Sequence, residues 1–306
     1  MGKMRIEKRP NLFLVGAQKA GTSALAGWLR EHPEVCMSFP KEPGYLAFGK
    51  QGYIFPDGNG QPAPPSRYVI KSYDDYINLY AQASDRQHVL ADASTWYLPL
   101  PGMAEKLYDF NPEAKIVIVF RNPIERAYSA WCHARSARVE PCETFAESLQ
   151  AESTRGEVEF LLRYHQMGLY SEAVKNYLRV FPREKIMLGF YDDLRNEPQR
   201  FWVHACAFLG INPAHLPDFK HKYNRSGVPR SRALHRVLSN YQLKKNLRAL
   251  IPHSLSLVIK KKLDDINLRD FPKMDEATGN ALRNFYRNDI AELETLTGRD
   301  LKAWLN

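Results

Sequence analysis

Short runs of consecutive apolar residues alternate along the chain with longer segments in which apolar residues recur every three or four positions. The first run, Asn11–Gly16, predicts a buried strand ending at a glycine, and Thr22–Glu31 after it predicts a helix with one apolar face. The most continuous run, Lys115–Phe120, predicts a second buried strand, and Asn122–Arg135 a helix that begins with N-cap and proline signals. This alternation predicts an α/β fold with a mainly parallel central sheet flanked by helices.

The same two periodicities predict the remaining elements. Strands are expected at His88–Ala93 and Lys185–Tyr191, and helices at Leu169–Phe181, Pro198–Leu209 and Asn280–Thr297. A segment rich in glycine and proline, Gly49–Ser66, predicts a surface loop. No internal repeat or domain boundary is visible. We therefore expect one domain over residues 1–306, with a core of about 10–304 and a basic region, 219–263, packed on it.

Positive charge is concentrated in that basic region. The net charge is +9, and no acidic residue lies between Asp218 and Asp264, where twelve lysines and arginines occur. Residues 222–231 predict a loop, and in 241–263 basic and apolar residues interleave. Such a stretch favours an anionic ligand, a glycan or peripheral contact with an anionic membrane; the alternative is a helix packed on the core with a solvated basic face.

Composition bears on the cellular location of the protein and on whether it binds a metal. No apolar run approaches the roughly 18–20 residues that span a bilayer, and the apolar stretch Leu12–Ala17 is too short for a signal peptide. The four cysteines are scattered, without the spacing of a zinc site. The aspartate pairs Asp74-Asp75, Asp192-Asp193 and Asp264-Asp265 are adjacent in sequence, which is typical of exposed acids and not of a metal site. We expect a cytoplasmic chain with reduced cysteines and no bound metal.

The loop between the first strand and helix, Gly16–Ser23, resembles the phosphate-binding pattern G-x-x-x-x-G-K-[ST] in the spacing of its glycines. Thr22 stands at the lysine position of that pattern, and Lys19 lies inside the loop instead. Backbone N–H groups and a helix N-terminus can still hold a phosphate or phosphosulfate there. The alternative is a tight turn with an exposed lysine. The displaced lysine and the lack of an evident magnesium-binding acid argue against a nucleoside triphosphate site.

A second anion-binding position follows the strand Lys115–Phe120. Arg121 comes directly after this strand, at the sheet edge where ligands bind in open parallel sheets, and Ser129 lies two turns into the next helix. An arginine and a hydroxyl can grip a second phosphate with charge-assisted hydrogen bonds. The alternative for Arg121 is a structural ion pair, for which Glu125 is the nearest candidate.

Several motifs, in their order, resemble those of PAPS-dependent sulfotransferases, most closely the heparan-sulfate-type domain and its bacterial relatives. They are Gln18-Lys19-Ala20-Gly21-Thr22-Ser23, Lys41-Glu42-Pro43, Arg121-Asn-Pro-Ile-Glu-Arg-Ala-Tyr-Ser129, Gly168-Leu-Tyr170, Tyr191-Asp-Asp-Leu194 and Gly298-Arg-Asp-Leu-Lys-Ala-Trp304. The resemblance spans roughly residues 10–304, and it implies a P-loop-like sulfotransferase fold and a sulfuryl transfer from PAPS, 3′-phosphoadenylyl sulfate, to an acceptor hydroxyl or, as second choice, an amine.

The resemblance also implies roles for individual residues. The loop of Lys19, Ala20, Gly21, Thr22 and Ser23 would hold the 5′-phosphosulfate, with Lys19 stabilising the leaving group, and Arg121 and Ser129 would bind the 3′-phosphate. Glu42 matches the general base, and Tyr191 belongs to a nucleotide-binding motif. The loop Lys222–Ser231, which includes Arg225, Ser226 and Gly227, would cover the nucleotide. His32, His88 and His133 are rival bases on chemical grounds alone.

The chain departs from the heparan-type pattern at two places. The family's acid-Lys-Ser/Thr-Pro-x-Tyr element is here Asp92-Ala93-Ser94-Thr95-Trp96-Tyr97, and the histidine after Lys-Glu-Pro is replaced by Gly44-Tyr45. These departures argue against copying a second catalytic lysine or a heparan-like acceptor. The acceptor stays open, possible classes being a glycan, a lipid, a small molecule or a carrier-bound chain.

Two other functions remain as alternatives. The glycine spacing of the first loop fits a P-loop nucleotide kinase or NTPase, which would need magnesium. The basic region fits a non-enzymatic binder of nucleic acid or another polyanion, although no known nucleic-acid-binding motif is present. The sequence does not determine the oligomeric state.

Overall fold

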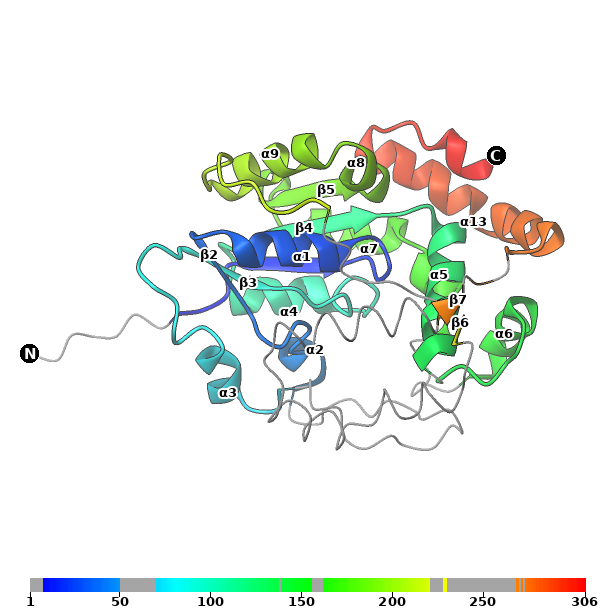
Figure 1. Ribbon diagram of the computed structural model, residues 1–306, viewed down its shortest axis with the longest axis horizontal. Coiled ribbons are helices and arrows are strands. Elements are labelled where there is room, and N and C mark those ends of the chain that lie inside the picture. Colours follow the sequence, from blue (N-terminus) through cyan, green and yellow to red (C-terminus); the bar gives the residue numbers. More distant parts are fainter. Residues whose placement is uncertain are drawn as a thin grey trace, which may run out of the picture.

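Five parallel strands form the central sheet of the computed structural model, in the order β2-β3-β1-β4-β5 (Figure 1). The strands are β1 (Leu12–Gly16), β2 (Val35–Met37), β3 (Val89–Asp92), β4 (Lys115–Phe120) and β5 (Ile186–Phe190). The structure describes residues 8–49, 70–137, 139–155, 162–220, 271 and 273–306, and the backbone of 228–229 and 268–269. The predicted α/β fold with a parallel sheet is therefore confirmed.

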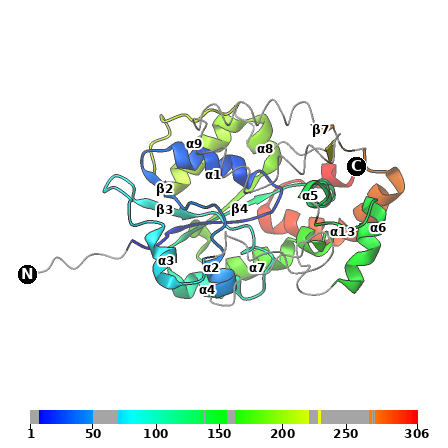
Figure 2. The ribbon, with the colours of Figure 1, turned by 60° about the horizontal axis from the view of Figure 1, so that its bottom comes forward.

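Helices cover both faces of the sheet. Figure 2 shows α1 (Thr22–Glu31), α8 (Tyr191–Asn196) and α9 (Pro198–Leu209) over one face. On the other lie α2 (Tyr45–Phe48), α3 (Tyr73–Asn78), α4 (Met103–Phe110) and α7 (Ser171–Val180). The remaining long helices are α5 (Pro123–Ala137), α6 (Phe145–Ala151) and α13 (Glu276–Thr297), and a short antiparallel pair joins β6 (Val228–Pro229) to β7 (Leu268–Arg269). No helix of the described residues is both long and apolar enough to span a bilayer.

The core is built on the two central strands, β1 and β4. All five residues of β1 are buried, as are the last five of β4, because helices cover both of their faces. Trp28 of α1 packs edge-on against Trp202 of α9 on one side of the sheet, and Phe13 packs against Phe110 and Tyr97 on the other. Burial of these large aromatic side chains is the main stabilising contribution here.

The direction in which the chain winds reverses between β1 and β4. From β1 the chain runs to β2 and β3 on one side, and to β4 and β5 on the other. In open parallel sheets, ligands bind at the carboxyl ends of the strands, where the direction of winding reverses. The loops after β1 and β4 both lie at that edge, as the sequence predicted.

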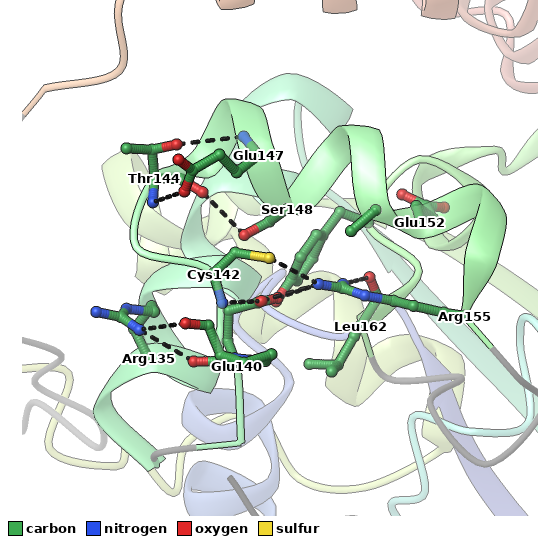
Figure 3. Close-up of polar contacts among 12 residues, drawn as sticks. Arg135, Glu140, Cys142, Thr144, Glu147, Ser148, Glu152, Arg155 and Leu162 are labelled. Carbon is green, nitrogen blue, oxygen red and sulfur yellow. Dashed lines mark hydrogen bonds and ion pairs between the residues drawn. The ribbon is translucent and has the colours of Figure 1, made fainter. Parts of the chain in front are cut away.

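A buried ion pair between Arg155 and Glu140 lies at the C-terminal end of α5. The Nη2 of Arg155 lies 2.8 Å from both carboxylate oxygens of Glu140, which also accept hydrogen bonds from the Tyr164 hydroxyl at 2.7 Å and the Cys142 N–H at 2.9 Å (Figure 3). Arg135, in the last turn of α5, donates to the carbonyl oxygen of Glu140 at 3.1 Å. The charges of Arg155 and Glu140 are thus paired with each other, and this network fixes the end of a helix that carries candidate site residues.

Candidate active site

The loop after β1 has two features of an anion-binding turn: left-handed backbone conformations and an uncapped helix N-terminus directly after them. Lys19 and Gly21 both adopt left-handed backbone conformations, with φ of 68° and 87°, and α1 begins at Thr22 without a side-chain cap on its N-terminus. A Cβ on Gly21 would lie 2.9 Å from Cδ2 of Tyr191, so only glycine fits. The uncapped amides of a helix N-terminus favour a bound anion.

Arg121 joins this loop to the end of β4. Its Nη1 donates to the carbonyl oxygen of Lys19 at 3.2 Å, and its guanidinium lies over the Tyr191 ring, 4.7 Å from the centroid. The Tyr170 hydroxyl donates to the Arg121 carbonyl oxygen at 3.0 Å. Backbone and side chain of Arg121 are thus both fixed, and the two loops predicted from sequence meet at one place.

The alternative that the sequence left open for Arg121 is also present. Nη2 and Nε bind Oε2 of Glu125 at 3.0 and 3.2 Å, in an ion pair whose glutamate side chain is 55% exposed. An ion pair this exposed stabilises a protein by only about 0–1 kcal/mol. Arg121 thus forms the structural ion pair with Glu125, and its role in binding a phosphate stays a prediction.

The ammonium of Lys19 lies in a crowded, positively charged place. Burial, together with the nearby guanidinium of Arg121, lowers the pKa of Lys19 to about 8. Arg126 and Lys41 act in the same direction. Since these groups repel one another in the free protein, binding of a polyanion relieves the repulsion.

Ser129 lies on α5 one turn before Cys132, half-buried. Burial raises the pKa of the Cys132 thiol to about 12, against the opposing effects of Lys19 and Arg121. The charges of Lys19 and Arg121 thus act on Cys132, one turn after Ser129 on the same helix, and the role of Ser129 in binding a phosphate stays a prediction.

Glu42 reaches the same region from the loop after β2. Its N–H donates to the carbonyl oxygen of Ala93 at 3.1 Å, which ties it to the end of β3. Its Oε1 accepts hydrogen bonds from Lys41 Nζ at 2.8 Å and Thr95 Oγ1 at 2.9 Å. With 29% of its side chain exposed, Glu42 is fixed and still accessible to a substrate.

The three histidines considered as rival bases have different surroundings. Desolvation and the nearby Lys19 lower the pKa of His133 to about 4, while Glu42 acts in the opposite direction, so His133 belongs to the site. His32 lies at the opposite end of α1, where its ring bonds the Asn212 carbonyl oxygen at 2.9 Å. His88 precedes β3, also away from the site, and bonds the Arg86 carbonyl oxygen. Position excludes both from the chemistry.

The structure adds Thr95, Lys41 and Arg126 to the predicted site residues. In the sequence, Thr95 was noted only because it departs from the family motif at 92–97. Arg126 was part of the motif at 121–129 but was given no role of its own. Arg225, Ser226 and Gly227 lie outside the described residues, as do most of the basic region 219–263 and the predicted loop 49–66 beyond its first residue. The described residues contain no cluster of histidine, cysteine and acidic side chains that could hold a metal ion.

Comparisons with known proteins agree with this geometry. A family model described as "Sulfotransferase domain" matches residues 9–226. The human bifunctional heparan sulfate N-deacetylase/N-sulfotransferase 2 is 27% identical over 212 residues, which cover 68% of this chain and 22% of that protein. Human heparan sulfate glucosamine 3-O-sulfotransferase 3B1 is 24% identical over 292 residues, covering 95% of this chain and 64% of that protein. The chain thus spans less than two thirds of either relative.

A solved structure matches nearly the whole chain. It is the crystal structure of a sulfotransferase from Alicyclobacillus acidocaldarius, 28% identical, with a TM-score of 0.73. The match covers 98% of this chain and 100% of the bacterial one. The likeness therefore includes the sheet and the loops at its carboxyl edge.

Proposed function

This chain belongs to the sulfotransferase family as a PAPS-dependent transferase, and from that premise we propose that it transfers a sulfuryl group to a hydroxyl of a carbohydrate acceptor. In this proposal the acceptor oxygen attacks sulfur as the bond from sulfur to the bridging oxygen of PAPS breaks. The acceptor proton passes to Glu42, and 3′,5′-ADP leaves. The carbohydrate class is supported by the names of the relatives, which act on heparan sulfate.

The donor would bind across the two loops. The amides of the loop after β1 and the hydroxyls of Thr22 and Ser23 would hold the 5′-phosphosulfate, and Arg121 with Ser129 would hold the 3′-phosphate. The observation that supports this most is the hydrogen bond from Arg121 Nη1 to the Lys19 carbonyl oxygen, at 3.2 Å. Because of it, the two anion-binding groups have a fixed separation before the nucleotide arrives.

Lys19 would neutralise the negative charge that grows on the bridging oxygen. A fixed ammonium in a partly desolvated site stabilises such a charge more than water does, because it needs no reorganisation. Its lowered pKa leaves it mostly protonated at neutral pH. Lysine, arginine and backbone amides together supply the positive charge that the transfer requires.

Glu42 would act as the general base. Both of its side-chain hydrogen bonds from described residues end on Oε1, so Oε2 has no such partner and can accept a proton. Such assistance is worth about 10²–10⁴-fold in rate. Glu42 to Gln keeps the shape and loses the base.

Transfer of ³⁵S from labelled PAPS to glycan acceptors tests the proposal. Heparosan oligosaccharides offer hydroxyls and N-acetyl groups, and de-N-acetylated heparosan adds free amines, which separates O- from N-sulfation. Heparosan serves here as a probe of hydroxyl chemistry and not as the assigned acceptor. We expect label on glycans that offer hydroxyls without free amines, a fall of at least about 100-fold in Glu42→Gln, and wild-type rates in Glu113→Gln, whose side chain is 84% exposed and remote from the site. Label on the amine substrate alone would overturn the hydroxyl assignment, and full activity of Glu42→Gln would overturn the base.

A further inference from the structure

Thr95 donates one of the two hydrogen bonds that orient the Glu42 carboxylate. Its hydroxyl lies 2.9 Å from Oε1, on a residue only 4% exposed. The other donor, Lys41, reaches the same oxygen at 2.8 Å but has 22% of its side chain exposed. A lysine ammonium on a flexible stem is a mobile donor, whereas a buried threonine hydroxyl donates from a fixed place.

The segment that presents Thr95 is held rigidly. Asp92, fully buried at the end of β3, accepts hydrogen bonds from the hydroxyls of Ser94 at 2.6 Å, Tyr76 at 2.7 Å and Tyr97 at 2.8 Å. The Tyr97 N–H closes a turn onto the Ser94 carbonyl oxygen at 3.2 Å. The residues on both sides of Thr95 are thus tied to one buried carboxylate, and the hydroxyl has little freedom to move away from Glu42.

The same segment also fixes the backbone of Glu42. The carbonyl oxygen of Ala93 accepts the Glu42 N–H at 3.1 Å, so residues 93–95 hold Glu42 at its main chain and at its carboxylate. These two contacts restrain the side chain, with Oε1 occupied and with Oε2 free of donors among the described residues. Preorganisation of this kind lowers the cost of reaching the reactive geometry.

We propose that Thr95 is a positioning residue for the transfer reaction, which holds Oε1 of Glu42 so that Oε2 takes the acceptor proton. The inference rests on the proposed function of Glu42 as general base. It concerns catalysis and not nucleotide binding, since Thr95 acts on the carboxylate alone. Thr95 should therefore affect kcat and leave the KM for PAPS unchanged.

The experiment compares Thr95→Val, which keeps the shape and loses the hydroxyl, with Thr95→Ser, which keeps the hydroxyl. We expect kcat for release of 3′,5′-ADP, measured with heparosan as acceptor and with water alone, to fall about 10- to 100-fold in Thr95→Val, the usual worth of a hydrogen bond to a charged group. Thr95→Ser should recover to within about threefold. The control is Ser148→Ala, which removes a buried hydroxyl hydrogen bond in α6, at 2.9 Å, away from the site.

A double-mutant comparison and crystal structures separate the possible failures. In a Glu42→Gln background, Thr95→Val should cause little further loss, because the base it positions is gone. An unchanged kcat in Thr95→Val, or an equal loss in both backgrounds, would overturn the inference while leaving Glu42 as base. A fully active Glu42→Gln would overturn both.

Crystal structures of the variants test the positioning role without an activity assay. Glu42 should keep its place in Thr95→Ser and adopt other rotamers in Thr95→Val, and an unmoved Glu42 in Thr95→Val would contradict the positioning role.

Discussion

Lys19 and Glu42 share a left-handed backbone conformation, with φ of 68° and 61°, and among the described residues no other position apart from glycine does so. This conformation costs a non-glycine residue roughly 1–2 kcal/mol. Strained positions of this kind concentrate at functional sites, where the surrounding structure holds them in place. The two residues proposed for leaving-group stabilisation and proton removal are thus the two that the fold maintains against a conformational preference.

The backbone strain at Lys19 predicts that replacement by glycine raises stability relative to alanine, while either replacement abolishes turnover. Both variants remove the charge, but only Lys19→Gly also relieves the left-handed strain, so we expect its free energy of unfolding to exceed that of Lys19→Ala by about 1 kcal/mol. Both variants should lose turnover. Urea denaturation of the nucleotide-free proteins measures the difference, and an alanine variant as stable as the glycine variant would show that position 19 is not strained.

The lowered pKa of Lys19 predicts that nucleotide binding takes up protons in alkaline solution. With a pKa of about 8, against the usual 10.5, half of the Lys19 side chains have lost their proton at pH 8 in the free protein. A bound polyanion favours the ammonium and raises this pKa, so binding should consume up to about half a proton at pH 8, where the phosphates of the nucleotide have already lost their protons. Calorimetry in two buffers of different ionisation enthalpy measures the uptake, which Lys19→Met should abolish.

The two fully or almost fully buried arginines should respond differently to loss of charge. Arg126 is 0% exposed, and its one hydrogen bond within the described part of the chain runs from Nη2 to the Tyr164 carbonyl oxygen at 3.4 Å. Among these same described residues, Nε and Nη1 have no hydrogen-bond partner. Because an unpaired buried charge is costly, we expect Arg126→Met to keep or raise the free energy of unfolding. The same variant should bind 3′,5′-ADP more weakly, since a nearby positive charge is lost.

Arg155→Met is the matched control for Arg126→Met. It leaves the Glu140 carboxylate buried without its ion-pair partner, which typically destabilises a protein by about 3–5 kcal/mol. Denaturation of both variants, with and without 3′,5′-ADP, makes the comparison. Equal destabilisation of the two would show that Arg126 is as well compensated as Arg155.

His133 should be neutral throughout the physiological pH range. Its pKa of about 4 depends on burial and on the charge of Lys19, so Lys19→Met should move it up toward the usual 6.5. Proton NMR of the imidazole follows this titration, with the resonance assigned by its absence from a His133→Gln sample. A wild-type midpoint near 6.5 would show that the imidazole is not desolvated, and an equal midpoint in the wild type and Lys19→Met would place His133 away from Lys19.

A strand or helix was predictable from the sequence where all of its residues have the same degree of burial. The strands β1 and β4 are buried on both faces, so each appears as an unbroken apolar run in the sequence. The strand β2 is only three residues long, and α3 only six, and neither has enough residues to show a period. Their positions depend on β3 and on tertiary contacts instead.

The site was predictable within each motif and not between motifs. Lys19, Glu42 and Arg121 were each identified from local sequence, but the contact of Arg121 with the Lys19 carbonyl oxygen depends on the register of β1 against β4. Thr95 lies at a position where the family pattern has proline, which carries no hydroxyl, so the motif gave no reason to expect a hydrogen bond. Its role depends on the length of the turn after β3.

The central claim is that the loops after β1 and β4 together bind a nucleotide with phosphates on both sides of its ribose. Titration calorimetry of the whole chain with 3′,5′-ADP in a magnesium-free buffer tests it, with ATP and AMP as comparisons. We expect one site that prefers 3′,5′-ADP over AMP by at least about tenfold, the usual contribution of a charge-assisted hydrogen bond, and that loses this preference in Arg121→Ala. Equal binding of AMP and 3′,5′-ADP, or tighter binding of ATP that depends on magnesium, would contradict the account.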